Sequence, residues 1–328
     1  MPIATARRHA GRHAIAPALV CALLLPLAAC HHAPPPPSNA TPEKAVATNL
    51  QLTSAGDFDG LMQNRLPPAD YTAWRAEWDK ARQQQAPASD TQTQQFAQIM
   101  QMLTEPGAEA KLAKRLQPEL AKLRGGPTQT LPIASGILEA AGKQMIAASP
   151  QLGATQRAMA TQALGVLLAW AKTTDFSDTK KAKKAIELVC TTARALHVQT
   201  LAQWRALDYA QAMHAYGVLW NGLEKLLDIY GLDLAGSLTS AKVSATANDG
   251  THATIKLDLT LAGQPLTGEW PMVKQADHWY DAALLDAWRQ AHPVPAASVG
   301  APALPSSASS AAPTSGSSAP APSGSAHA

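Results

Sequence analysis

The hydrophobic pattern of this chain changes its period near residue 240, and this change restricts the possible folds more than any other feature. Before it, apolar residues recur every three or four positions, as on one face of a helix. After it, in THATIKLDLTLAG at 251–263, apolar and polar residues alternate, as in a strand with one buried face. Runs of helices followed by runs of strands are typical of α+β proteins, so we expect this fold class.

Four antiparallel strands forming a meander are expected over 241–282, followed by a short C-terminal helix. The NDG sequence at 248–250 predicts a tight hairpin turn. Within 252–261, the alternation places Ile255, Leu257 and Leu259 against the helices, and Lys256 and Asp258 toward water. The expected strands are 241–248, 251–263, 265–275 and 278–282, and the last helix is 284–291.

The preceding part of the folded domain, 42–232, is expected to be helical. Thr41 and Pro42 suit the start of the first helix, and Gly56 suits its end. Pro118 interrupts a leucine stripe and should kink or split its helix. The apolar run 158–171 is shorter than the roughly 20 residues that span a membrane, so a buried helix is expected there. Further helices are expected at 57–66, 69–81, 94–103, 109–124, 134–148, 155–173, 178–196 and 208–230.

The first 29 residues have the layout of a secretory signal peptide. Three arginines precede the apolar run AIAPALVCALLLPLAA, which ends in small residues. Its end, Leu27-Ala28-Ala29-Cys30, resembles the lipobox of bacterial lipoproteins. That resemblance implies cleavage before Cys30 and acylation of Cys30, and two or more acyl chains would anchor the protein stably. The alternative is an ordinary secretory peptide that is cleaved near a cysteine by coincidence.

The lipobox resemblance also implies a location in the bacterial cell envelope. His31 stands where an aspartate would favour retention in the inner membrane, so we expect a lipid anchor in the outer membrane and a domain facing the periplasm. Residues 30–41 are proline-rich and should form a semi-rigid tether. Residues 293–328 contain no Asp, Glu, Lys or Arg and consist mostly of Ala, Ser and Pro, which predicts a disordered tail.

The charge balance argues against a nucleic-acid partner. The whole chain has 27 basic and 24 acidic residues, and three of the basic ones lie in 1–29. A chain that begins at Cys30 therefore has 27 − 3 = 24 basic residues against 24 acidic ones, which leaves no excess for phosphate contacts. The lysine-rich sequence DTKKAKKAIEL at 178–188 could contact anionic lipid, although a solvated helix face is the simpler interpretation.

The sequences at the beginning and at the end of the folded part resemble those of a known superfamily. SAGDFDGLMQ at 54–63 and MVKQADHWYDA at 272–282 resemble the NTF2-like (cystatin-like) α+β superfamily, with matches at Gly56, Asp57, Leu61 and Trp279. The segment between them is far more helical than in typical members, so a large helical insertion and a different α+β fold both stay open. The stretch 206–234 also resembles part of a lipoprotein family without an assigned activity.

The superfamily resemblance implies one set of candidate catalytic residues. Some NTF2-like proteins are enzymes with an aspartate base and a tyrosine or histidine donor. The corresponding candidates are Asp59, Tyr71, Asp258 and His278. Asp59 can also simply solvate its helix, Asp258 lies on the polar strand face, and His278 follows a turn. Their spacing does not require catalysis.

Other signs of chemistry are weak in the sequence. It contains no HExxH, paired CxxC, GxSxG or glycine-rich phosphate loop, so no cofactor, metal site or catalytic residue is predicted. Cys190 shares an apolar helical stripe with Ile186, Val189 and Leu196, which predicts a buried, inert thiol. We therefore expect a non-catalytic binding module that engages a protein or an apolar ligand, with an NTF2-like enzyme as the alternative.

Overall fold

The structure is a computed structural model that describes residues 39–124 and 130–293. Side chains are described within these ranges except at 123–124, 130–135 and 137–138. The predicted signal peptide, Cys30, most of the tether, and the tail beyond residue 293 lie outside the described residues. The described residues up to His292, 39–124 and 130–292, belong to one unit by their contacts.

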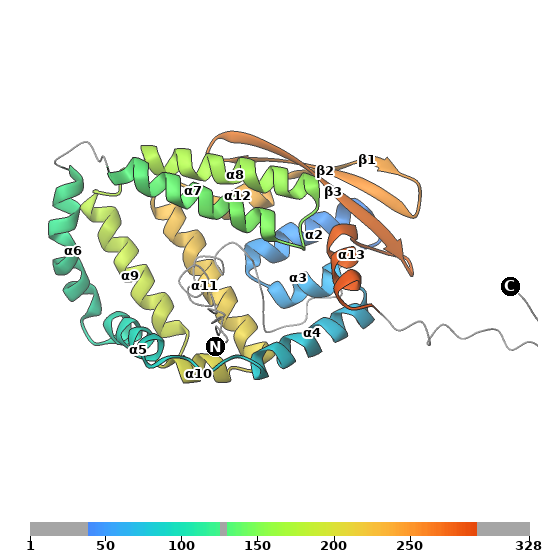
Figure 1. The fold of residues 1–328 in the computed structure, drawn as a ribbon. Coiled ribbons are helices and arrows are strands. Elements are labelled where there is room, and N and C mark those ends of the chain that lie inside the picture. The colour runs from blue at the N-terminus through green and yellow to red at the C-terminus, as the bar shows by residue number, and fades with distance from the viewer. Residues whose placement is uncertain (1–38, 125–129, 294–328) are drawn as a thin grey trace, which may run out of the picture. The chain divides into compact units, whose positions relative to one another are not determined.

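The described chain is mostly helical and ends in an antiparallel sheet and a last helix, so the α+β prediction is confirmed (Figure 1). The helices before the sheet are α2 (Pro42–Ala55), α3 (Phe58–Arg65), α4 (Pro68–Gln83), α5 (Asp90–Thr104), α6 (Ala108–Arg124), α7 (Thr130–Ala148), α8 (Ala154–Thr173), α9 (Thr179–Ala195), α10 (Leu201–Ala206), α11 (Tyr209–Ile229) and α12 (Leu234–Thr239). The sheet consists of β1 (Lys242–Asn248), β2 (His252–Leu261), β3 (Gln264–Gln275) and β4 (His278–Asp281), and α13 (Ala282–Ala291) follows.

Capping residues explain where the first helices begin and end. The Thr41 side chain accepts a hydrogen bond from the Lys44 N–H, and Pro42 occupies the first turn of α2. Gly56 has φ +68°, a left-handed conformation that ends α2 at little cost for glycine. Asp57 then caps α3 by accepting a hydrogen bond from the Gly60 N–H.

Two features of the helical part differ from the sequence prediction. Helix α6 continues through Pro118, so of the two predicted outcomes, a kink or a split, the split does not occur. Pro118 is exposed, so water can hydrogen-bond the backbone carbonyl one turn earlier that loses its partner. The second difference is that α10 and α12 were not predicted, because helices of six residues are too short to show a clear period.

The sheet is a meander in the order β1-β2-β3-β4, with every neighbouring pair antiparallel. Its hairpins turn through residues with positive φ. Gly250 has φ +89° after β1, Gly263 has φ +75° after β2, and Ala276 and Asp277 have φ +47° and +65° before β4. These turns set a register in which Leu257 lies opposite Gly268 and Ile255 lies opposite Trp270.

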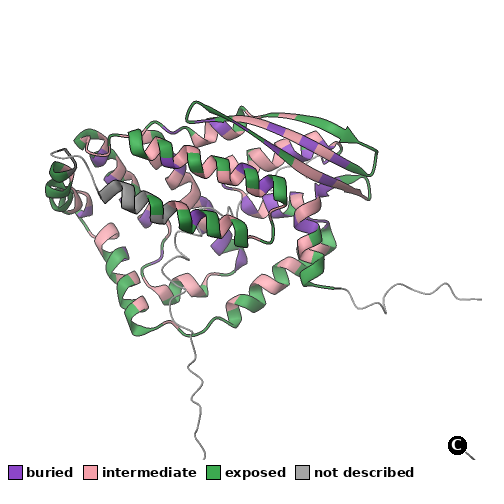
Figure 2. Ribbon diagram, turned by 45° about the horizontal axis from the view of Figure 1, so that its top comes forward, coloured by how far each residue is buried: buried purple, intermediate pink, exposed green. Residues whose placement is uncertain are grey.

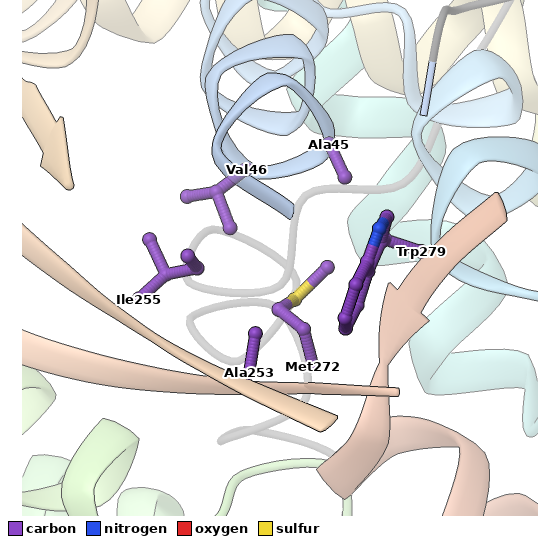
Figure 3. Close-up of a cluster of buried hydrophobic side chains, with 6 residues drawn as sticks. All are labelled: Ala45, Val46, Ala253, Ile255, Met272 and Trp279. Atoms are coloured by element: carbon purple, nitrogen blue, oxygen red, sulfur yellow. The ribbon is translucent and has the colours of Figure 1, made fainter. Parts of the chain in front are cut away.

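One face of the sheet is covered by α2, α8 and α12 (Figure 1). Ile255 and Leu257 point into this interface and are buried, whereas Lys256 and Asp258 on the other face are partly exposed, as the alternation predicts. Figure 2 shows how the degree of burial varies along the strands of the sheet. Leu259 is only half-buried, although it packs on the same cluster. Figure 3 shows the interface with α2, where Ala45, Val46, Ala253, Ile255, Met272 and Trp279 form one buried group.

Helix α8 approaches the sheet closely because of a glycine in β3. A Cβ atom at Gly268 would lie 2.4 Å from the Met159 sulfur and 3.1 Å from the Met159 Cβ. Any larger residue at this position would force the Met159 side chain of α8 to move. The apolar run 158–171, predicted to be a helix buried within the bundle, instead buries one face only: Met159 and Leu168 are buried, whereas Ala158, Gln162, Gly165 and Ala169 are exposed. Met159 packs this helix onto the sheet beside Leu257 and Leu266.

Buried polar groups join the two ends of the folded part. The Asp281 side chain is fully buried, accepts a hydrogen bond from Arg65 Nη2 at 2.8 Å, and caps α13 through the Leu284 N–H. Asn39 is 3% exposed, and its amide donates to the Asn64 carbonyl while its own carbonyl accepts from the Trp279 N–H. Asn39 belongs to the segment predicted as a tether, yet it is already part of the fold.

Helices α5, α6 and α9 pack around a small apolar cluster that contains Cys190. Cys190 is fully buried, and burial raises the pKa of its thiol, in agreement with the predicted inert cysteine. Ile186 is buried beside it, but Val189 is 36% exposed, so Val189 lies at the edge of the stripe to which it was assigned.

Candidate functional site

The four residues suggested by the superfamily resemblance do not form one site. Asp59 on α3 and Tyr71 on α4 lie together. Asp258 lies on the partly exposed sheet face, where it pairs with Lys256 at 2.8 Å and accepts a hydrogen bond from Thr267. His278 is exposed at the start of β4 and stacks on Tyr280. Only the first pair therefore qualifies as a constellation.

Asp59 is surrounded by donors from three helices. The hydroxyl of Tyr209, at the start of α11, donates to Asp59 Oδ1 at 2.7 Å, and the hydroxyl of Tyr71 donates to the same oxygen. Gln63 Nε2 donates to Oδ2 at 3.0 Å from one turn further along α3. The carboxylate thus ties α3, α4 and α11 together and is satisfied by the protein itself.

Burial and the neighbouring Asp59 carboxylate keep Tyr71 and Tyr209 protonated. Burial, and then the hydrogen bond and negative charge of Asp59, raise the pKa of Tyr71 to about 12, and the same causes raise the pKa of Tyr209 further. The rings of Trp74 and Trp78 meet the Tyr209 ring edge to face, and the Arg75 guanidinium lies 4.5 Å from its centre. Tyrosines held in this way act as hydrogen-bond donors to Asp59.

A separate hollow lies between the end of α9 and the start of α11. Its volume is about 490 Å³. Most of its lining is apolar, and the polar part consists of one acid, one amide and two imidazoles. The lining residues are Ala195, Leu196, His197, Val198, Leu207, Asp208, Ala210, Gln211, His214 and Ala215. We refer to it as the α9–α11 hollow.

Local backbone geometry places the polar groups of the α9–α11 hollow. His197 has φ +53° and follows the last turn of α9 in the left-handed conformation, which turns the chain toward α10. Asp208 and Gln211 cap α11 reciprocally, because each side chain accepts a hydrogen bond from the backbone N–H of the other. His214 lies about one turn further along α11 and is exposed.

The α9–α11 hollow is lined by His197, which follows α9, and by His214, which lies on α11. The sequence does not predict that these two histidines line the same hollow. No group of three or more His, Cys, Asp or Glu side chains suited to a metal ion is found within 39–124 and 130–293. In the same ranges, no helix is long and apolar enough to cross a membrane.

Comparison of the chain with models of known protein families, with curated proteins and with solved structures found no match. The resemblance to the NTF2-like superfamily consequently stays a prediction that rests on the residues at 54–63 and 272–282.

Two features of these sites escaped the sequence analysis. Tyr209 follows the capping residue Asp208, and its sequence position gives no sign of its contact with Asp59, 150 residues earlier. The α9–α11 hollow forms where the end of α9 lies against the start of α11. The hydrophobic period of a helix does not predict which other helix it packs against. The capping pattern of Asp208 and Gln211 is the one local signal that was available.

Proposed function

We propose that this protein is a lipid-anchored lipoprotein of the bacterial cell envelope, facing the periplasm from the outer membrane, and that its folded domain is a non-catalytic binding module. The anchor is supported by the basic start, the apolar run and the sequence Leu27-Ala28-Ala29-Cys30. Binding is supported by the α9–α11 hollow, whose volume falls within the range of about 300–1,000 Å³ typical of small-molecule sites.

The observation that carries the non-catalytic part is that three protein side chains already donate hydrogen bonds to Asp59. A general base takes a proton from a substrate, whereas these donors hold the Asp59 carboxylate in contacts within the protein. One of its oxygens accepts from Tyr71 and Tyr209, and the other accepts from Gln63. A structural role is sufficient to explain Asp59, because it is the hydrogen-bond acceptor that joins α3, α4 and α11.

Membrane attachment is tested on the chain isolated from cells. Mass spectrometry of the membrane fraction should find a protein that begins at an acylated Cys30. Cys30→Ser should leave the protein without a lipid anchor. A soluble wild-type protein with an unmodified N-terminus would contradict the proposed anchor.

Ligand binding is tested by thermal shift with a set of apolar and amphiphilic small molecules. A ligand present at 100 times its Kd should stabilise the protein by about 2.7 kcal/mol. Ala210→Trp, which places a ring at the α9–α11 hollow, should abolish the shift. Ala76→Trp, at an exposed position on α4, should leave it intact. Equal shifts in both variants would exclude the hollow as the binding site.

The enzyme alternative has one observation in its favour, the meeting of Asp59 and Tyr71. It predicts that the purified protein turns over a periplasmic compound and that Tyr71→Phe abolishes this turnover. The binding proposal predicts that Tyr71→Phe, combined with Asp258→Asn and His278→Gln, leaves ligand binding unchanged in a folded protein. Circular dichroism and the melting temperature would establish that the variant is folded.

A further inference from the structure

The N-terminal end of α9 has a charge arrangement that works against its own helix. Lys180, Lys181, Lys183 and Lys184 all lie within its first six residues. The N-terminus of a helix carries partial positive charge, so cations there are unfavourable and acids are preferred. Lys180 and Lys181 lie in the first turn, where their charge brings no electrostatic benefit to the helix, which suggests that this cluster of lysines serves another purpose.

The fold neutralises these lysines only in part. Lys183 Nζ is 3.9 Å from the Glu187 carboxylate, and the residues Lys180, Lys183 and Lys184 are all exposed. The nearby Asp178 carboxylate is engaged as the cap of α9, where it accepts hydrogen bonds from the Lys180 and Lys181 N–H groups. Residues 172–191 contain five lysines and three acids, a formal excess of 5 − 3 = +2, in a chain that is neutral from Cys30 onward.

Aromatic side chains accompany these lysines. Phe176, in the loop between α8 and α9, lies 5.9 Å from Trp170 and 5.0 Å from Tyr230 between ring centres. All three rings are half-buried, and Lys181 Nζ lies 6.0 Å from the centre of the Tyr230 ring. Aromatic rings beside lysines are typical of surfaces that rest at the boundary between water and lipid headgroups. We name these three rings together with Lys180, Lys181, Lys183 and Lys184 the basic aromatic patch, in which Lys181 is the lysine that contacts a ring.

We propose that the basic aromatic patch binds the surface of a membrane that contains anionic phospholipids and forms a second contact beside the lipid at Cys30. The proposal rests on the membrane tether of the proposed function. Nine residues of chain connect Cys30 to Asn39, and they can extend over at most about 30 Å. The folded domain is thereby held close to the membrane, where even a weak electrostatic contact is occupied for much of the time.

The test uses the full-length chain with Cys30→Ser, so that no acyl chain contributes, and measures sedimentation with vesicles. Vesicles of phosphatidylglycerol in phosphatidylcholine are compared with phosphatidylcholine alone. Any binding through the apolar residues 1–29 is common to all variants and cancels in the comparison. The test variant is K180Q/K183Q/K184Q. The matched control is K44Q/K80Q/K242Q, which removes the same charge from exposed lysines on α2, α4 and β1.

The parent protein should bind the anionic vesicles more tightly than the neutral ones, and added salt should weaken this binding. Each lysine near an anionic surface contributes about fivefold in affinity, so the patch variant should bind about a hundredfold more weakly. The control should stay within about twofold of the parent. Because the substitutions remove cations from a helix N-terminus, the patch variant should melt no lower than the parent, which separates lost binding from lost folding.

Equal losses in the patch and control variants, or no preference of the parent for anionic vesicles, would overturn the proposal. So would binding of soluble polyphosphate through the patch without binding to vesicles, because that result would assign the lysines to a soluble anion. The experiment does not depend on acylation of Cys30, so its failure leaves the proposed anchor standing, and an absent anchor leaves the vesicle result valid.

Discussion

Glu224 is a carboxyl group on the buried side of α11, and it makes the stability of this protein depend on pH. It is 8% exposed, and its Oε1 atom has no hydrogen-bond partner among the described residues. Burial raises its pKa to about 7, and the negative charge of Asp233 contributes in the same direction. The indole of Trp220 and the charge of Lys225 oppose this rise in part.

The raised pKa predicts that the protein loses stability as pH rises from about 4.5 to about 7. In this window the native state binds a proton more tightly than the unfolded chain does, so deprotonation favours unfolding. Glu224→Gln removes the ionisable group and should increase the free energy of unfolding at pH 8 by about 1–3 kcal/mol relative to wild type, with little difference at pH 4.5. Urea denaturation at the two pH values measures this. A stabilisation of equal size at both would contradict the assigned pKa.

Buried and exposed residues alternate along β2, so substitutions at neighbouring positions should change the free energy of unfolding by different amounts. Leu257 is 2% exposed and lies between the sheet and the helices, whereas the neighbouring Lys256 side chain is 42% exposed. Leu257→Ala should lower the free energy of unfolding by about 2–5 kcal/mol through lost burial and a cavity. Lys256→Ala should change it by no more than about 0.5 kcal/mol. Chemical denaturation compares the two, and equal effects would mean that the register is wrong.

At the scale of the whole molecule, a buried ion pair connects α3 to the segment that starts α13. Arg65 and Asp281 lie 216 residues apart in sequence, and Gln156 on α8 also donates to Asp281. The Lys256–Asp258 pair on the sheet has the same 2.8 Å separation but lies where both side chains are partly exposed. The two pairs differ in burial, in the cation, and in the additional bonds that Asp281 accepts from the Leu284 N–H and from Gln156.

Asp281→Asn should lower the free energy of unfolding by about 3 kcal/mol, because it leaves the Arg65 charge without its buried partner. Asp258→Asn should cost less than about 1 kcal/mol, since an exposed pair is screened by solvent. Guanidinium denaturation followed by both far-ultraviolet circular dichroism and tryptophan fluorescence would measure the losses. The two signals should shift together, because the pair joins helical and sheet regions. Separate transitions would show that these regions unfold independently.

The sequence by itself determined the fold class and most elements of this protein. Helical period, capping residues such as Thr41 and Asp57, and the alternation through Ile255 and Leu257 are local properties, because each depends on neighbours within a few residues. The buried state of Cys190 followed from the same periodicity. The proposed lipoprotein leader also rests on local signals alone, since the basic residues, the apolar run and the lipobox-like sequence are contiguous.

The tertiary structure alone decided which side chains meet. The contact of Tyr209 with Asp59, the burial of Glu224, and the position of His197 near His214 depend on the packing of helices that are distant in sequence. Period and propensity specify which face of a helix is apolar but leave its partner open, because apolar burial is non-directional. Hydrogen bonds and close contacts are directional and short in range, so they exist only once the backbone has placed both partners.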